Sequence, residues 1–448
     1  MNSNEKNYIL LILLHIVIGF VIFFIPALSK PLAALVFLTG LFFIVKNQNK
    51  NQEVLLISAY VVGSEIFFRM TGGIIIYEFA KYSIIIFMIM GMYYDGFSKN
   101  AMPYWFFLIL LIPGLLVATE TLNLTTDLRK TISFNISGPV CLGIASIYAY
   151  NKRVSLTKLN QVLLCIGLPI ISITVYLILY TPDLKEALVL GTGSNYTTSG
   201  GFGPNQVATI FGMGMFIFFS RLLLESKTKL LFAINIIVTF IITYRGLITF
   251  SRGGMITGFV MIILLLLYLY RSTQHQGKSK LHFLFGFMVL MFLATWIYTS
   301  NQTDGLIEKR YANQDASGRV KESQFTGREE IFTNEINSFI DNPIFGVGVA
   351  KGVEIRTNLT GEVALTHNEI SRMLAEHGLF GIMALLILFL TPIILFLDNK
   401  QHIFLWCFML FWLLTINHAA MRLSAAAFVY SLTLLKVYIN EESPLHRK

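Results

Sequence analysis

The stretch "LTHNEISRMLAEHGLFGIMALLILFLTPIILFL" (residues 365–397) begins with polar side chains and continues into a long apolar run. Its last twenty residues, 378–397, contain no charged side chain, and about 20 apolar residues are what an α-helix needs to cross a lipid bilayer. Apolar runs of similar length recur along nearly the whole chain. We therefore expect a membrane helix whose polar start, with His367 and Asn368, lies at one surface of the bilayer.

The composition of the chain is that of a membrane protein. Of its 448 residues, 55% are hydrophobic and only 13% are charged, whereas a soluble domain carries about 25% charged residues. The mean hydropathy is +0.67. Backbone groups inside a bilayer must find their hydrogen bonds within the protein, which excludes open sheets and lipid-exposed loops there. The expected fold is therefore all-α, a polytopic bundle of membrane helices without a separate soluble domain.

Apolar windows place the expected membrane helices. Fourteen windows can be read, and because some are short, the expected number of transmembrane helices is about 12–14. The first window lacks the small-residue cleavage pattern of a signal peptide, so we expect it to be retained. The windows lie at residues 8–28, 31–46, 54–68, 73–93, 104–119, 131–150, 162–181, 204–221, 229–245, 251–270, 281–299, 378–397, 403–416 and 420–438.

Short loops rich in Lys and Arg indicate the cytoplasmic side of a membrane protein. Such loops lie at 46–53, 150–161, 221–229 and 271–280. Both termini are then expected inside the cell, and the long polar segment 300–377 is expected outside, between late helices. This orientation divides the chain into N-terminal membrane helices, 1–250, and a second region, 251–448, that contains the large extracytoplasmic loop.

Arginine is enriched on the expected outer side, where the positive-inside rule alone predicts no such excess. Its planar fork of donors suits phosphate. The enrichment is therefore consistent with a phosphorylated ligand handled outside, and equally with headgroup contacts and surface ion pairs. Only four arginines are expected inside. The ten outer ones are Arg69, Arg129, Arg245, Arg252, Arg310, Arg319, Arg328, Arg356, Arg372 and Arg422.

Two capping-box patterns occur in segment 300–377. "TGRE" (326–329) opens an amphipathic helix expected near the membrane surface and places Arg328 in its first turn. "THNE" (366–369) places His367 in the first turn of the helix that becomes a membrane span. A helix N-terminus carries partial positive charge, so it attracts anions and disfavours a protonated imidazole. We therefore expect a neutral His367 that can accept a proton, with a simple polar cap as the alternative role.

Other outer histidines rank below His367, because His377 and His418 begin no capped helix. "FSRGGMITG" (250–258) sets Arg252 at the entrance of a membrane helix, either beside a ligand or as an interfacial anchor next to a close helix contact. "SGGFGPNQVA" (199–208) places Asn205 directly after Pro204 at a helix start. This stretch lacks the Lys and Ser/Thr of a nucleotide-binding loop, so it predicts no nucleotide site.

No metal site is predicted. The three cysteines lie in apolar spans, and no paired carboxylates or His/Asp cluster with metal-ligand spacing occurs in the outer segments. Glu78 and Lys81 are three residues apart in an expected membrane helix and should form an ion pair. Such a pair is most simply structural, but a proton-coupled carrier would also use one.

The residues that follow His367 resemble the signature of bacterial O-antigen ligases, H-[NSQ]-x9-G-x-x-[GTY]. After His367 and Asn368, nine residues lead to Gly378, and two more lead to Gly381. The stretches "SRGG", "TGR", "NPIFGVG" and "HNEI…EHGLFG" are similar to motifs of the wider O-antigen ligase/polymerase superfamily. The resemblance covers about residues 250–385, whereas the first 200 residues match only as a hydrophobic pattern.

This resemblance implies a membrane glycosyltransferase with a GT-C-type fold and an inverting, metal-independent mechanism that needs no cofactor. Its donor would be a glycan on undecaprenyl diphosphate, used on the periplasmic side of the bacterial inner membrane. By position, Arg252 and Arg328 correspond to arginines associated with the donor diphosphate, and His367 corresponds to the histidine proposed as the base. The supporting candidates are Asn368, Arg245, Arg319, Arg372 and Asn205.

The signature does not fix the acceptor. Transfer to lipid A–core is the first expectation, polymerisation of undecaprenyl-linked repeat units the second, and transfer to protein serine the third. The expected partners are the donor glycolipid, lipid A–core or a growing glycan, and membrane lipids, but no nucleic acid. A flippase or glycan transporter is the rival from another class, and it should line a continuous polar path through the spans. Arg252, Arg328 and His367 all belong to the expected outer end, which favours the enzyme.

Overall fold

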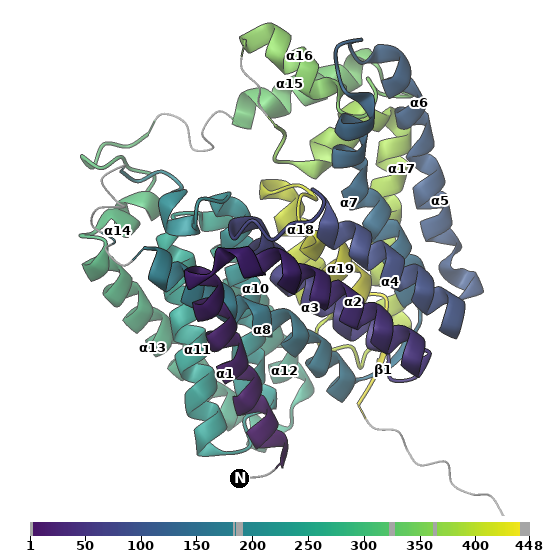
Figure 1. Ribbon diagram of the computed structural model, residues 1–448. Coiled ribbons are helices and arrows are strands. Elements are labelled where there is room, and N and C mark those ends of the chain that lie inside the picture. Colours follow the sequence, from purple (N-terminus) through teal and green to yellow (C-terminus); the bar gives the residue numbers. More distant parts are fainter. Residues whose placement is uncertain (1–2, 182–183, 185–190, 322–327, 362–364, 440–448) are drawn as a thin grey trace, which may run out of the picture.

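The computed structural model of this chain describes all residues except 1–2, 182–183, 185–190, 322–327, 362–364 and 440–448 (Figure 1). The described residues are almost entirely helical. Its α-helices are α1 (Ser3–Phe24), α2 (Ser29–Asn47), α3 (Glu53–Met70), α4 (Phe79–Asp95), α5 (Met102–Leu110), α6 (Ile112–Thr121), α7 (Leu128–Ala149), α8 (Leu156–Tyr180), α10 (Pro204–Leu224), α11 (Lys229–Ile248), α12 (Arg252–Ser272), α13 (His275–Gln302), α14 (Leu306–Tyr311), α15 (Arg328–Asp341), α16 (Lys351–Thr360), α17 (Glu369–Asp398), α18 (Leu405–His418) and α19 (Ser424–Leu432). Short 3₁₀ helices are η1 (Pro26–Leu28), η2 (Lys99–Ala101) and η4 (Thr197–Ser199), and the strands are β1 (Arg153–Ser155) and β2 (Lys436–Tyr438).

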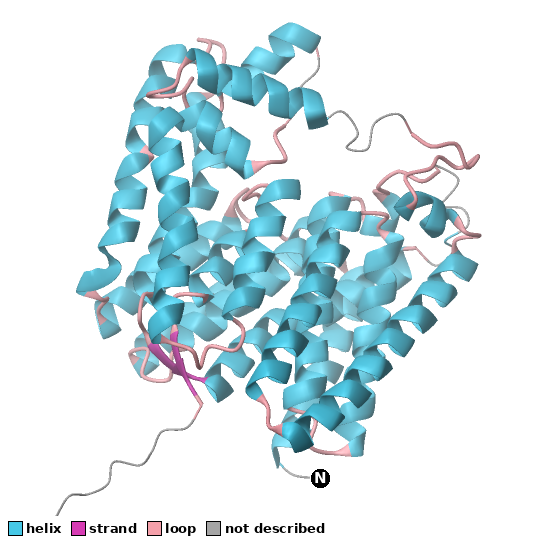
Figure 2. Cartoon of the chain, turned by 180° about the vertical axis from the view of Figure 1, so that it is seen from behind, coloured by secondary structure: helices cyan, strands magenta, loops and turns pink. Residues whose placement is uncertain are grey.

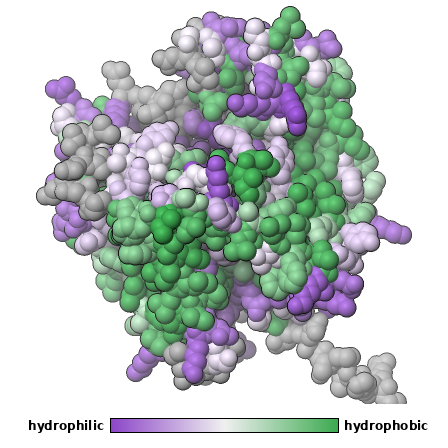
Figure 3. All heavy atoms as spheres, viewed as in Figure 1, coloured by the Kyte–Doolittle hydropathy of each residue, from purple (hydrophilic) through white to green (hydrophobic). Residues whose placement is uncertain are grey.

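The helices run between two ends of the molecule. The N-terminus and β1 lie at one end, and α14, α15 and α16 lie at the other (Figure 1). At the first end β1 and β2 pair in parallel, with Arg153 opposite Lys436, which is the small magenta pair in Figure 2. The molecule therefore separates the loops expected inside from the segment expected outside, as their charges predicted. Hydrophobic side chains cover the flanks between these ends, while hydrophilic ones gather at the ends themselves (Figure 3).

The all-α polytopic fold is confirmed, but the number of long spans is smaller than predicted. Among the described residues, ten helices are long and apolar enough to cross a membrane. The predicted window 73–93 becomes the 17-residue helix α4, which begins only at Phe79. Helix α18 has 14 residues, and α3 carries Glu65 and Arg69 near its end. The apolar windows predicted too many spans, because some of the helices that form there are shorter than the window or carry buried charged residues.

The predicted helix 420–438 is helical only in its middle part. This run forms the nine-residue helix α19, and its last residues form strand β2. Its side chains are packed inside the protein, since the residues of α19 that are apolar have essentially no exposed surface. The run still passes from the start of α17, where Arg422 contacts Thr366, to the opposite end, where β2 pairs with β1.

Glycines bring α10 and α12 into backbone contact. A Cβ on Gly212 would lie 2.0 Å from the carbonyl oxygen of Gly254, and one on Gly258 would lie 2.3 Å from that of Gly212. Small residues permit this close approach between membrane helices. The glycines after Arg252 therefore form a close helix contact. This is one of the two interpretations that the "SRGG" stretch allowed. The contact fixes the start of α12, where Arg252 lies.

A sharp kink divides α17 at Gly378, which has φ of +59° and ψ of −134°. The preceding carbonyls lose their helical partners and accept instead from the "NPIFGVG" loop. The N–H groups of Val347 and Gly348 donate to Ala375 and Glu376, at 2.9 and 3.2 Å. The N–H of Leu379 donates to Pro343, at 2.8 Å. The glycine of the signature is thus the point where the polar start of α17 turns into its membrane-spanning part.

Replacing Gly378 with Ala should destabilise the protein. The positive φ strains any residue with a Cβ, and that Cβ would lie 2.6 Å from the carbonyl oxygen of Ile344. We expect a loss of about 1–3 kcal/mol, seen as a lower unfolding temperature of the purified protein in detergent. Gly286→Ala in α13 is the matched control, because nothing lies within 4 Å of its added Cβ. Equal unfolding temperatures for both variants would contradict the role given to the kink.

The orientation in the membrane remains a prediction, and it is testable by fusion. We expect an alkaline phosphatase fused at Gly318, next to α14, to be active, because this enzyme folds only outside the cytoplasm. The same enzyme fused at Gly277, near the start of α13, should be inactive. These two glycines lie at opposite ends of α13. Activity at Gly277 alone would invert the orientation.

Candidate active site

His367 lies in a pocket between the start of α17 and the helix α15. The pocket has a volume of about 580 Å³, within the range of about 300–1,000 Å³ that is typical of ligand sites. One wall is polar and comes from the residues around His367, and the other carries apolar side chains of α15. The lining residues are Glu329, Ile331, Phe332, Thr333, Glu335, Thr366, His367, Asn368, Ser371 and Asn417.

Helix α17 begins later than the capping box predicts. Its N-cap is Asn368, whose Oδ1 accepts from the N–H groups of Ile370 and Ser371, at 2.8 and 3.3 Å. Glu369, the expected partner of Thr366 in the box, instead accepts from the N–H of Met421 at 3.2 Å. The prediction that His367 lies in the first helical turn is therefore wrong. It precedes the cap by one residue, still beside the N-terminus of α17.

The segment that carries His367 is held by the end of α18 and the residues after it. The backbone oxygen of His367 accepts from the N–H of Ala420 at 3.1 Å. The amide nitrogen of Asn368 donates to Oδ1 of Asn417 at 3.2 Å, and the guanidinium of Arg422 donates to the backbone oxygen of Thr366 at 2.5 Å. These contacts fix the backbone on both sides of the imidazole.

A buried carboxylate holds α15 against the pocket. Glu335 is 3% exposed, accepts from Nη1 of Arg356 in α16 at 3.1 Å, and accepts from the hydroxyl of Ser371 in α17 at 2.5 Å. Three helices thus meet at one side chain. Arg328 is the first residue of α15, as predicted, and precedes the pocket residue Glu329. The predicted cap at Thr326 lies outside the described residues.

Arg252 is the first residue of α12. The turn before it is fixed by the hydroxyl of Ser251, which donates to Oδ1 of Asn205 at 2.7 Å. Asn205 lies in the first turn of α10. The starts of α10 and α12 therefore lie side by side, and two helix N-termini at one place favour an anion there.

Two further cations lie near Arg252. Burial raises the pKa of the Tyr311 hydroxyl to about 12, and the positive charges of Arg252 and Arg310 oppose this shift. Burial also lowers the pKa of the Lys321 ammonium, and repulsion from Arg310 lowers it further. Attraction by the carboxylate of Asp315 opposes this shift, and the repulsion from Arg252 is smaller. We call Arg252, Arg310 and Lys321 the cationic cluster. Like charges held together raise the free energy of the site, and a bound anion relieves this repulsion.

Arg310 also shapes the turn that presents Arg252. Its Nε donates to the backbone oxygen of Phe250 at 2.8 Å, and its Nη2 donates to the hydroxyl of Ser194 at 3.2 Å. Phe250 has a φ of +56°, which is strained for a residue with a Cβ. The guanidinium thus supports a strained turn directly before α12 while adding its charge to the cationic cluster.

The end of α18 connects the cationic cluster with the pocket of His367. The ring of His418 packs on Gly253, where an added Cβ would lie 2.8 Å from the ring. Its Nε2 lies 3.0 Å from the hydroxyl of Thr209 in α10. The preceding residue, Asn417, contacts Asn368 and lines the pocket. The starts of α10, α12 and α17 and the end of α18 therefore converge at one place.

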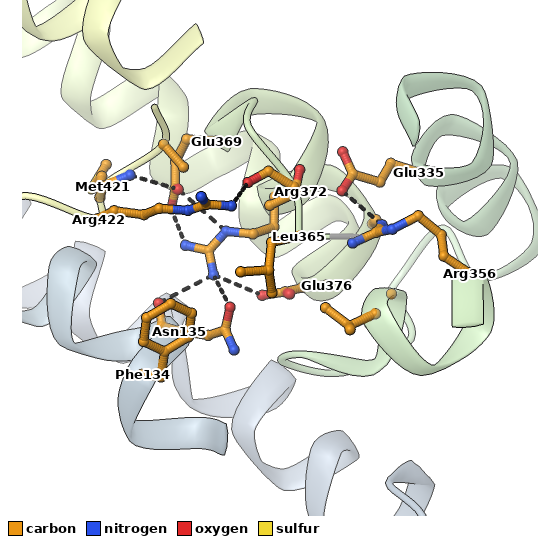
Figure 4. A pocket seen from close by; sticks show the side chains of 15 residues that line it. Phe134, Asn135, Glu335, Arg356, Leu365, Glu369, Arg372, Glu376, Met421 and Arg422 are labelled. Atoms are coloured by element: carbon orange, nitrogen blue, oxygen red, sulfur yellow. Dashed lines mark hydrogen bonds and ion pairs between the residues drawn. The ribbon is translucent and has the colours of Figure 1, made fainter. Parts of the chain in front are cut away.

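Arg372, a supporting candidate, lies deeper and is engaged by carboxylates. It forms ion pairs with Glu369 and, at 3.4 Å, with Glu376. Its Nη1 also donates to the backbone and side-chain oxygens of Asn135, at 3.1 and 3.2 Å. Figure 4 shows this arrangement, with the Glu335–Arg356 pair beside it. The cavity among these residues is only about 30 Å³, so Arg372 joins α17 to α7 rather than facing a ligand-sized space.

The remaining supporting arginines lie apart from the pocket. Arg245 is 2% exposed and donates to the backbone oxygen of Leu177 and the hydroxyl of Thr181, at 3.0 and 2.9 Å. It therefore holds the end of α8. Arg319 is exposed, in a loop where its backbone N–H donates to Asp315 at 2.9 Å. Of the predicted set, the structure brings together His367, Asn368, Arg252 and Asn205.

The predicted ion pair between Glu78 and Lys81 is present, with a distance of 2.7 Å. Glu78 is the residue before α4 rather than inside a membrane helix, and it also lies 3.5 Å from Arg69. Arg69 pairs in turn with Glu65 at 3.0 Å. This network lies where α3 ends and α4 begins, not along a path through the helices, so it gives no support to a proton-coupled carrier.

Sequence reasoning did not single out Arg310, Lys321, Asn417 or Glu335. Arg310 was only one of ten outer arginines, and Lys321 stands in a polar loop with no motif. His418 ranked low because it ends a helix rather than beginning one. The local signal for all of them is weak, because the residues they contact come from distant parts of the chain.

A comparison with known protein families gives a match within the second half of the chain. Residues 237–386 match the family model described as O-antigen ligase. The matched segment contains Arg252, Arg328, His367 and both signature glycines, so the resemblance noted on these residues is confirmed. No curated protein matches the chain, and no solved structure matches it.

Proposed function

Because the chain carries an O-antigen ligase domain at residues 237–386, we propose that it transfers a glycan from an undecaprenyl-diphosphate carrier to an acceptor hydroxyl. The proposed acceptor is lipid A–core, on the periplasmic side of the bacterial inner membrane. The single observation that carries this proposal is the convergence of the cationic cluster and His367 on the end of α18. A cationic group for the leaving diphosphate and a base for the incoming hydroxyl are the two parts that the reaction needs.

The cationic cluster is the proposed site of the donor diphosphate. Arg252 offers a planar fork at a helix start, while Arg310 and Lys321 add positive charge to the same place. Asn205 and Ser251 provide polar groups at the neighbouring start of α10. Because these groups lie at the ends of membrane helices, a donor lipid can keep its chain in the bilayer while its diphosphate reaches them.

His367 is the proposed general base. The acceptor oxygen forms a bond to the anomeric carbon of the glycan while its proton passes to the imidazole. The bond from that carbon to the diphosphate oxygen breaks, and undecaprenyl diphosphate leaves with the electron pair. One displacement of this kind inverts the anomeric centre and involves no covalent enzyme intermediate. Diphosphate is already a good leaving group. On the side of the leaving group, cationic side chains that stabilise its negative charge therefore take the place of a general acid.

A deletion strain tests the function and its acceptor. Under the proposal, the strain loses all long glycan from lipid A and retains polymer on the undecaprenyl carrier. A strain with single repeat units on lipid A would instead identify a polymerase. Loss of glycan from protein alone would identify a protein transferase. Loss of the surface glycan, with donor glycolipid trapped on the inner side of the membrane, would identify a flippase and refute the transferase.

A further inference from the structure

We propose that a second pocket, lined by Tyr77, Tyr82, Phe134, Asp127 and Lys130, binds a sugar ring of the acceptor, an inference that rests on the proposed glycan transfer. This acceptor pocket has a volume of about 550 Å³. It lies where α4 and α7 begin, next to α16, and Leu365 forms one of its edges. Phe134 and Leu365 also border the small cavity around Arg372, whereas Tyr77, Tyr82, Asp127 and Lys130 line the acceptor pocket and not that cavity.

The lining of the acceptor pocket has the chemistry of a saccharide site. Aromatic faces pack on the C–H groups of a sugar ring, and carboxylate, amide and hydroxyl groups bond its hydroxyls. Tyr77 is 58% exposed, and its ring centroid lies 5.7 Å from that of Phe134. A large aromatic side chain exposed among polar ones is typical of a binding surface. Asp127, Lys130, Thr131, Ser133 and Asn135 supply the polar groups.

The charges of the acceptor pocket favour a sugar without net charge. Asp127 and Lys130 carry opposite charges, and the backbone N–H of Lys130 donates to Asp127 at 3.1 Å. The floor is formed by Glu78, which is 3% exposed and ion-paired with Lys81 at 2.7 Å. The guanidinium of Arg69 lies 5.4 Å from the centroid of the Tyr77 ring. The ring that stacks on the sugar is thus itself held in place.

Leu365 and His367 connect the acceptor pocket with the proposed base. Leu365 lines the acceptor pocket, whereas Thr366 and His367 line the pocket of about 580 Å³. Two residues of extended chain span at most about 7 Å, so a sugar seated beside Leu365 can place a hydroxyl near His367. Beneath this segment, ion pairs of Arg372 fill the space (Figure 4). The glycan therefore passes over the segment rather than beneath it.

The acceptor pocket contacts the segment of His367 through Leu365, which precedes His367 in the chain, whereas the cationic cluster is connected to it through Asn368, which follows His367. From His367 the contacts run through Asn368 and Asn417 to His418 and Gly253, beside Arg252. In Figure 1, α14 lies at the far left, whereas α4 and α7, whose first residues border the acceptor pocket, lie to the right of the centre. An inverting displacement requires the nucleophile to approach from the face opposite the leaving group. A pocket that contacts the segment of His367 on the other side in the chain from the cationic cluster therefore suits the acceptor and not the donor.

Kinetics of the purified enzyme with undecaprenyl-diphosphate-linked glycan and lipid A–core test this assignment. Tyr77→Ala and Phe134→Ala should each raise the KM for lipid A–core roughly 3- to 10-fold, the loss expected for one aromatic contact. The KM for the donor and kcat at saturating lipid A–core should stay within about 2-fold. Tyr93→Ala is the matched control, because Tyr93 is 83% exposed near the other end of α4. It should match the wild type throughout.

Other outcomes separate this inference from the proposed function. If wild type and controls transfer glycan but neither variant changes the KM for lipid A–core, the acceptor assignment is wrong while the function stands. A rise in the KM for the donor alone would also overturn it. If the wild type transfers to undecaprenyl-linked repeat units instead, the titration is made with that lipid. Because Tyr77 is exposed, Tyr77→Ala should fold, and its unfolding temperature is measured to check this.

Discussion

His367→Ala should reduce glycan transfer by a factor of about 100 to 10,000, the range expected when a general base is removed. The reason is chemical, because the acceptor hydroxyl then keeps its proton as it attacks the anomeric carbon. The fold should persist, since the contact that holds this segment uses the backbone oxygen of His367 and not its ring. The measurement is single-turnover transfer by the purified variant, with the unfolding temperature in detergent recorded in parallel.

Two further histidine variants decide what kind of role His367 has. His367→Gln keeps a polar side chain that forms hydrogen bonds but cannot take up the proton, and it should be as inactive as His367→Ala. His282→Ala is the matched control, because His282 is an exposed histidine near the start of α13. It should transfer at the wild-type rate. A His367→Gln variant of normal activity would show that the residue binds substrate and is not the base.

Arg252→Ala should reduce transfer on the order of 100-fold or more, as expected when a group that stabilises developing negative charge is removed. The loss should appear in kcat and in the KM for the donor, because the same guanidinium holds the diphosphate before and during bond cleavage. Arg252→Lys should recover only part of the activity, since a point charge does not replace the bidentate fork. The measurement is transfer to a fixed concentration of lipid A–core over a range of donor concentrations.

The loop arginine Arg319 provides the matched control for Arg252. It belongs to the same outer segment but is exposed, and Arg319→Ala should retain near-normal transfer. Arg328→Ala should also lose activity if α15 brings this arginine to the diphosphate. Normal activity in Arg252→Ala together with loss in Arg319→Ala would move the diphosphate site into the loop and overturn the role of the cationic cluster.

The mistaken helix start shows why local patterns misplace a cap. Two overlapping signals exist, since Thr366 and Asn368 are both good N-cap residues. The box would need Glu369 to turn back toward Thr366. In the fold, Glu369 is fully buried and pairs with Arg372 and the N–H of Met421. A long-range contact with residue 421 therefore decides the start of α17, and no window of sequence contains it.

Composition and motif spacing determined the all-α membrane architecture and the grouping of segments at its two ends. They also singled out His367, Arg252 and the signature glycines, which lie within the matched segment 237–386 and whose roles stay predictions. Each membrane helix requires a continuous apolar stretch of sequence, so the apolar runs locate these helices directly. The sequence also predicted the ion pair of Glu78 with Lys81, because residues three apart on a helix are neighbours.

Tertiary structure alone decided which charged residues form the site. Arg252 lies at the start of α12, Arg310 in α14 and Lys321 in the loop after α14, and the contact of Arg310 with Phe250 is what brings the start of α12 to the other two. The sequence alone does not distinguish the environment of Arg372 from that of Arg252. In the fold, buried carboxylates form ion pairs with Arg372. Arg252 instead begins α12, whose position is set by the glycine contact with α10. The physical reason is that charge and hydrogen-bond partners act over a few ångströms in space, regardless of separation along the chain.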